Sequence, residues 1–179
     1  AERGEPSSMT AAEELIDVVD DDDRVVGRAT RADMRQRNLL HRAVYLVLEN
    51  GRGEIFVHRR TDTKDVYPGF YDVTVGGVVG AGESYEVAAE RELAEEVGVA
   101  GVAISPLFSV RFEDASTRLV GRAFLARWDG GVTLQQEEVA WGAFVPRAEA
   151  ERVMRVERCC PDGADVLRRY LATRDATTS

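Results

Sequence analysis

A glycine-rich loop followed by a helix crowded with carboxylates occupies residues 77–99 and constrains the rest of the chain. The segment reads GVVGAGESYEVAAERELAEEVGV. Ser84 is a favourable N-cap, residues 85–97 are mostly good helix formers, and Gly98 suits the left-handed conformation that ends a helix. The sequence therefore predicts a loop followed by a helix over 85–97, and this helix is unusually acidic.

Three carboxylates of this helix share one face. At about 100° per residue, Glu92, Glu95 and Glu96 fall within an arc of about 100°. Carboxylates this close repel one another unless a cation lies among them, and Mg²⁺ prefers such oxygen ligands. The spacing predicts a magnesium site, and the alternative is an acidic helix face that is simply exposed to solvent.

The spacing of the whole segment favours the metal site. Gly77 is followed after five residues by Glu83, and after seven more by the run Arg91-Glu92-Leu93-Ala94-Glu95-Glu96-Val97-Gly98-Val99. Every fixed position of the Nudix box, G-x5-E-x7-R-E-U-x-E-E-x-G-U with U a bulky aliphatic residue, is filled. The chain therefore resembles the Nudix hydrolases, and a pattern fixed at so many positions is far more specific than a short glycine motif.

The resemblance implies an α/β fold, the Nudix fold, with a mixed β-sheet in an α/β/α sandwich. It also implies Mg²⁺- or Mn²⁺-dependent cleavage of a diphosphate that is linked to a nucleoside or a related organic group. Glu92 and Glu96 are implied to be the principal metal ligands, and Glu95 a further ligand or the base that activates water. The backbone carbonyl of Gly76 or Gly77 is the implied ligand that is not a carboxylate.

The other fixed positions of the box are implied to be structural. Arg91 and Glu83 are expected to form an ion pair that orients the loop and the helix, and Gly77 and Gly98 to provide the backbone turns. Nudix proteins are often dimers, so a homodimer is also expected.

Charged residues outside the box are further candidates for the site. Arg59 and Arg60 end a predicted strand and Lys64 follows in a polar loop, where they are placed to bind phosphates, although strand ends often carry solvated arginines. Glu138 or Glu137 is the alternative to Glu95 as the general base. These two acids also fit an exposed loop before a strand.

A narrower resemblance extends beyond the box. The segments LIDVVDDDDRVVGRATRADMRQRNLLHRAV and RRTDTKDVYPGFYDVTVGGVV are similar to uncharacterised bacterial Nudix hydrolases related to type 1 isopentenyl diphosphate isomerase. The Cys, the metal-binding His and the Glu-x-Glu pair of the isomerase align with Val75, Gly77, Thr117 and Leu119. Isomerisation needs a proton donor and an acceptor, so the residues favour hydrolysis over isomerisation. The intact carboxylates favour an enzyme over a nucleotide-binding module without turnover.

The composition of the chain limits the classes of partner that the protein is expected to bind. The net charge of −9 argues against binding to nucleic acid polymers, which requires many Lys and Arg. No apolar run approaches the roughly 18 residues of a membrane span, and no signal peptide is visible. The adjacent Cys159 and Cys160 predict reduced thiols and hence a cytoplasmic protein. The expected partner is a small diphosphate-containing substrate.

The predicted elements form one main domain with an N-terminal extension. Residues 1–37 are expected to hold a flexible N-terminus and a short β-hairpin, residues 38–172 the Nudix domain, and residues 173–179 a loose tail. Strands are predicted at 15–20, 24–30, 41–49, 54–60, 71–75, 102–112, 118–128 and 139–145. Helices are predicted at 32–38, 85–97, 148–158 and 164–172, with a break at 161–163.

Overall fold

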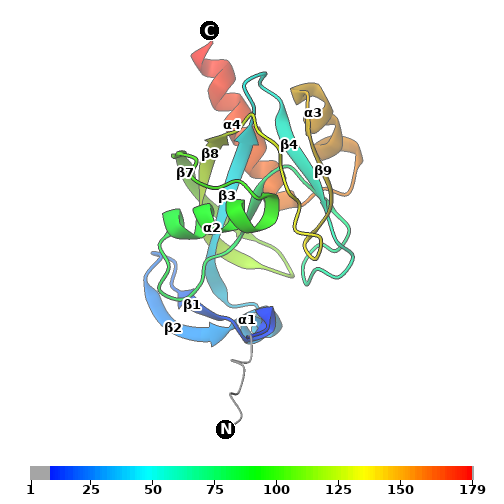
Figure 1. Ribbon diagram of the computed structural model, residues 1–179. Helices are drawn as coiled ribbons and strands as arrows, with labels where there is room; N and C mark the ends of the chain where they lie inside the picture. Colours follow the sequence, from blue (N-terminus) through cyan, green and yellow to red (C-terminus); the bar gives the residue numbers. More distant parts are fainter. Residues whose placement is uncertain (1–8, 179) are drawn as a thin grey trace.

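Nine strands form one mixed sheet in residues 9–178, the part of the chain that the computed structural model describes. Predictions for residues 1–8 and for Ser179 lie outside it. Helices cover both faces of the sheet, with α2 in front and α4 behind in Figure 1. The predicted α/β fold, a mixed sheet between helices, is therefore confirmed.

The element bounds are as follows. The strands are β1 (Leu15–Val19), β2 (Val25–Thr30), β3 (Leu40–Glu49), β4 (Ile55–Arg60), β5 (Tyr71–Asp72), β6 (Val75–Val78), β7 (Ile104–Glu113), β8 (Arg118–Arg127) and β9 (Val139–Val145). The helices are the 3₁₀ helix η1 (Ala11–Glu13) and the α-helices α1 (Arg31–Arg37), α2 (Tyr85–Val97), α3 (Arg147–Val156) and α4 (Pro161–Thr177).

Strand β3 lies at the centre of the sheet. It pairs in parallel with β8 and antiparallel with β6, β1 and β4. Its odd-numbered residues, from Ala43 to Val47, pack with α3 and α4 in one core. Its even-numbered residues, from Val44 to Leu48, pack with α2 in a second core. Because successive side chains of a strand point to opposite faces, a strand buried on both faces has a continuous apolar run.

The N-terminal hairpin of β1 and β2 holds the glycine-rich loop before α2. The carboxylate of Asp17 accepts a hydrogen bond from the backbone N–H of Gly82 at 2.8 Å. The carbonyl of Leu15 accepts another from the N–H of Ala81 at 2.9 Å. Because β1 also pairs with β3, the hairpin fixes this loop relative to the main sheet.

The strand predicted at 71–75 is divided into β5 and β6. The carboxylate of Asp72 accepts hydrogen bonds from the backbone N–H and the hydroxyl of Thr74, at 3.0 and 3.1 Å. Aspartate side chains that bond the backbone two residues on favour turns, so the chain bends here. Because of this bend, only β6, and not β5, leads into the start of the box.

Helix α4 is longer at both ends than the sequence predicted. Proline is favourable at the first helical position, so the segment 161–163 begins α4, and the predicted break between the two C-terminal helices lies at 157–160 instead. At the other end the helix continues to Thr177, and most of the tail predicted as loose is helical. The cause is a long-range contact, because Arg174 and the hydroxyl of Tyr170 both donate to the buried carboxylate of Glu49.

The described helices include none with the length and apolar character that crossing a membrane requires. Cys159 and Cys160 are free thiols. Burial raises the pKa of both, to about 12 for Cys159, so neither is a reactive thiolate at neutral pH.

Two buried histidines make the fold sensitive to acid. His41 and His58 are 1% and 2% exposed, and burial lowers their pKa values from 6.5 to about 4 and about 3. The unfolded chain therefore binds protons that the folded chain does not. The stability that these neutral histidines contribute is complete above pH 6.5 and is lost as the pH falls toward 4.

We expect His58→Leu to reduce this acid sensitivity. The Nδ1 atom of His58 has no hydrogen-bond partner among residues 9–178. Removing this atom therefore takes no hydrogen bond away from another residue. Between pH 6.5 and 5 the variant should lose about 2 kcal/mol less unfolding free energy than the wild type. Urea denaturation of both proteins at pH 7 and pH 5 measures the difference. Equal losses would show that His58 is protonated in the native protein.

Candidate active site

Helix α2 is anchored so that its carboxylates face the end of β6. The side chain of Ser84 caps its N-terminus, and Gly98, with a φ of 68°, ends it. Leu93 and Val97 are buried against the sheet. These contacts fix both the axis of the helix and its rotation about that axis.

Arg91 connects the loop to the helix. Its Nε and Nη2 atoms donate to the two carboxylate oxygens of Glu83 at 2.9 and 2.8 Å, the bidentate geometry that a guanidinium favours. Its Nη1 atom donates to Glu92 at 2.8 Å. Glu83 also accepts from the N–H of Gly80 at 2.7 Å. The predicted ion pair is thus formed, and it holds the loop against the start of the site.

Two buried carboxylates, Glu92 and Glu96, form what we call the inner pair. The side chain of Glu92 is 12% exposed, and Glu96 is 6% exposed. Burial raises the pKa of both, and repulsion from Glu92 adds to the effect at Glu96, whose pKa rises to about 8. Over residues 9–178 no side chain donates a hydrogen bond to the Glu96 carboxylate. Glu92 shares the charge of Arg91, whereas Glu96 is buried beside it without such a donor, and such a carboxylate favours a bound cation.

Glu95 lies at the rim of this site. Its side chain is 52% exposed, and one of its oxygens is 3.3 Å from Nη1 of Arg91. In the described part of the chain, no three acidic, histidine or cysteine side chains converge closely enough to form a complete metal cage. The inner pair nevertheless fits Mg²⁺, which commonly takes one or two carboxylates and completes its shell with water and substrate phosphates.

Two adjacent glycines bring the backbone of β6 up to the inner pair. A Cβ atom on Gly77 would lie 2.6 Å from a carboxylate oxygen of Glu92. A Cβ atom on Gly76 would overlap the carbonyl oxygen of Val44 in the neighbouring strand. Gly76 is therefore required by the backbone of the neighbouring strand, whereas a side chain at Gly77 would displace the carboxylate of Glu92, beside which the backbone of β6 lies.

Comparison with known proteins decides the family. The profile of the NUDIX domain matches residues 39–168. The chain belongs to the Nudix family. It is 45% identical over 171 residues to an uncharacterised Nudix hydrolase of Streptomyces coelicolor, covering 94% of each chain. It is 38% identical over 157 residues to the uncharacterised Nudix hydrolase YfcD of Escherichia coli, covering 88% of this chain and 86% of YfcD.

A solved structure agrees with this assignment. The crystal structure of DR0079 from Deinococcus radiodurans superposes with a TM-score of 0.76 at 30% identity, covering 87% of this chain and 98% of that one. The matched family and relatives are Nudix hydrolases, so this protein is a hydrolase that acts on diphosphate bonds.

The inner pair of this Nudix hydrolase lines a cleft of about 600 Å³. Side chains of both charges face this cleft. Its charged lining residues include Arg28, Arg31, Lys64, Arg91, Glu92, Glu95, Glu96 and Glu138. Lys64 and Glu138, which the sequence assigned to different roles, form an ion pair with each other. Glu137 is exposed and does not line the cleft.

The predicted substrate contacts do not all reach the site. Arg60 lines a smaller cavity beside the cleft, whereas Arg59 lines neither. Its guanidinium donates to the carbonyl of Gly69 at 3.1 Å and lies 3.6 Å from Asp62. Neighbouring residues of a strand point to opposite faces, so Arg59 and Arg60 do not reach the same site. We therefore remove Arg59 from the candidate contacts.

Sequence reasoning missed the cations that the N-terminal extension supplies. Arg28 of β2 and Arg31 of α1 line the cleft, and Arg35 of α1 lines the smaller cavity. No motif or spacing marks these residues. They reach the site only because β1 pairs with β3, a contact between segments that are separated in sequence.

Proposed function

We propose that this Nudix hydrolase cleaves the diphosphate linkage of a small organic or nucleoside diphosphate with Mg²⁺, or Mn²⁺, bound by Glu92, Glu96 and the backbone carbonyl of Gly76. The inner pair is the observation that carries the proposal. Such a metal supplies charge neutralisation at the phosphate oxygens and lowers the pKa of a bound water.

The cationic side chains around the cleft are proposed to hold the diphosphate. Lys64 and Arg31 line both the cleft and the smaller cavity, and Arg60 lines the smaller cavity. A protein with a net charge of −9 needs such local positive charge to attract an anionic substrate. Glu95 and Glu138 remain the two candidates for the base that accepts the proton of the attacking water.

Glu95 and Glu138 differ in their present partners. Glu95 is bound by Arg91 and projects from the same helix as the inner pair. Glu138 is bound by Lys64, which a substrate phosphate would draw away. Binding of the diphosphate would therefore free Glu138 at the moment when a base is needed, and Glu95 would stay in place throughout.

A substrate panel tests the proposal. Nucleotide sugars, dinucleotides, nucleoside triphosphates and small organic diphosphates are incubated with Mg²⁺ or Mn²⁺, and phosphate-containing products are measured. We expect turnover of at least one class that stops when EDTA is added. Failure of every class with both metals would refute the proposed activity.

Isopentenyl diphosphate belongs in the same panel, because the isomerase has a related fold. Of the aligned isomerase positions, Thr117 and Leu119 line the smaller cavity, and the hydroxyl of Thr117 accepts a hydrogen bond from Arg35 at 3.3 Å. Neither side chain can exchange a proton with an alkene. We expect NMR spectra of isopentenyl diphosphate incubated with the protein to show no incorporation of deuterium.

A further inference from the structure

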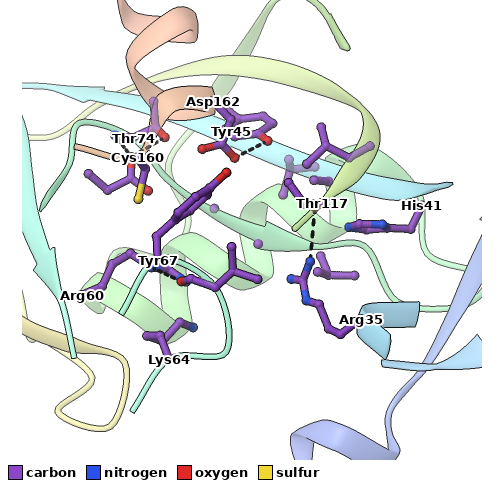
Figure 2. Close-up of a pocket in the computed structure, with 18 of the residues that line it drawn as sticks. Arg35, His41, Tyr45, Arg60, Lys64, Tyr67, Thr74, Thr117, Cys160 and Asp162 are labelled. Carbon is purple, nitrogen blue, oxygen red and sulfur yellow. Dashed lines mark hydrogen bonds between the residues drawn. The ribbon is translucent and has the colours of Figure 1, made fainter. Parts of the chain in front are cut away.

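The smaller cavity adjoins the cleft, and we call it the chamber (Figure 2). It has a volume of about 80 Å³ and shares Arg31, Lys64 and the segment Gly76–Val78 with the cleft. Since about 10–15 Å³ of such volume holds one water, the chamber has room for a group of about five to eight non-hydrogen atoms. A substrate whose diphosphate lies in the cleft would place its attached group here.

His41 presents an unpaired acceptor to the chamber. It is almost fully buried, and its Nδ1 atom lies 2.9 Å from the carbonyl oxygen of Leu39. Because a carbonyl only accepts, Nδ1 carries the proton and Nε2 carries a lone pair. This Nε2 atom is buried and has no hydrogen-bond partner among residues 9–178. A ligand with a donor would satisfy it.

The opposite side of the chamber is also rich in acceptors. Figure 2 shows Asp162, Tyr45 and Thr74 together on the side away from His41. The Asp162 carboxylate accepts from the hydroxyl of Tyr45 at 2.8 Å, and Asp72 accepts from Thr74. Burial raises the pKa of both aspartates. A carboxyl oxygen can accept more than one hydrogen bond, so these groups offer further acceptor sites to a polar ligand. A hydrocarbon group in the chamber would leave the buried Nε2 atom of His41 without a partner, which is unfavourable.

Resting on the proposed hydrolysis of an organic diphosphate, we propose that the chamber binds the organic group and selects a small polar one whose hydroxyl or amino hydrogens donate to Nε2 of His41 and to the carboxyl groups opposite. Arg31 and Lys64, at the junction with the cleft, hold the diphosphate. An isoprenoid group has no donors, and a complete nucleoside is larger than the chamber. The substrate class is therefore a small polyol or amino-alcohol diphosphate.

Two isosteric diphosphates test the selection directly. The 2,3-dihydroxypropyl and 2-methylbutyl diphosphates have the same arrangement of non-hydrogen atoms, and two hydroxyls of the first are replaced by carbon in the second. We expect wild-type kcat/KM to be about tenfold to a hundredfold higher for the dihydroxypropyl compound. The Kd values of the matching methylenebisphosphonates with Mg²⁺, measured by calorimetry, should show the same preference without any turnover.

A matched pair of variants assigns the selection to His41. His41→Leu should reduce the preference to less than threefold. His58→Leu should keep it, because His58 is equally buried and also has an unpaired ring nitrogen but does not line the chamber. His41→Gln, which retains a side-chain acceptor, should restore part of the preference. A full preference in folded His41→Leu would overturn the role of His41.

The outcomes separate this inference from the proposed activity. If the wild type hydrolyses both diphosphates equally well, or prefers the methylbutyl compound, the chamber assignment is wrong and the hydrolytic activity stands. If nothing in the panel is hydrolysed, the activity is refuted, and the calorimetric comparison still decides on the chamber. Preferential binding of the dihydroxypropyl analogue then supports the assignment, and equal or absent binding overturns it.

Discussion

Glu92→Gln is expected to lower the kcat of the proposed Mg²⁺-dependent reaction by about three orders of magnitude, because it removes a charged group that we propose as a metal ligand and that would contribute several kcal/mol to transition-state stabilisation. The amide has the size of the carboxylate. Its oxygen can still accept a hydrogen bond from Arg91, whose Nη1 atom lies 2.8 Å from a carboxylate oxygen of Glu92 in the wild type. The fold should therefore remain intact. Steady-state kinetics with the best substrate of the panel measure the loss, and Mn²⁺ titration followed by EPR measures the weakened binding of metal.

Glu95→Gln is the matched comparison on the same helix. Its side chain lies at the rim, so the variant should bind Mn²⁺ nearly as the wild type does, whatever its effect on kcat.

Mg²⁺ should also raise the Tm of the wild type, since a ligand that binds only the folded state stabilises it, and should not raise that of Glu92→Gln. Rates like those of the wild type in Glu92→Gln would show that this residue does not bind the metal.

Gly76→Ala destabilises the protein by about 3 kcal/mol or more, at the upper end of the cost of overpacking. The added Cβ atom would overlap the carbonyl oxygen of Val44, and backbone of the central strand cannot move aside as the end of a flexible side chain can. The antiparallel pairing of β6 with β3 would have to open. Urea denaturation gives the change in unfolding free energy.

Two other glycines provide the controls for this prediction. Gly27 of β2 faces open space, and a Cβ atom added there would have no neighbouring atom within 4 Å, so Gly27→Ala should change stability by less than about 1 kcal/mol. At Gly77 the added Cβ atom would meet the mobile carboxylate of Glu92. Gly77→Ala should therefore impair metal binding more than stability. Gly76→Ala with the stability of the wild type would contradict the close approach of β6 to β3.

The box could be predicted from sequence because its information is local. The cap at Ser84, the stop at Gly98 and the ion pair between Arg91 and Glu83 lie within one loop and one helix. Helical periodicity also placed three carboxylates on one face. It could not show that Arg91 holds Glu95 at the rim, because the direction of a long side chain depends on its partners as well as on its position in the helix.

The remaining features depend on contacts between distant segments. The length of α4 depends on the contact of Arg174 with Glu49, which no local pattern indicates. The selectivity proposed for the chamber depends on the unpaired Nε2 atom of His41. A single histidine in an apolar strand gives no sign of whether its ring faces a core or a cavity. Such features require the packed structure, because burial and partner choice arise only when the elements meet.

The hydrogen bond between the carboxylate of Asp17 and the N–H of Gly82 limits how far the N-terminus of this enzyme can be shortened. The domain match starts at residue 39, which invites a shortened version that omits everything before it. That version would uncover the start of β3, where Val18 pairs with His41, and free the loop that leads into α2, and it would also discard Arg28 and Arg31. A minimal catalytic unit must therefore begin ahead of Leu15, and any affinity tag belongs on a spacer upstream of that point.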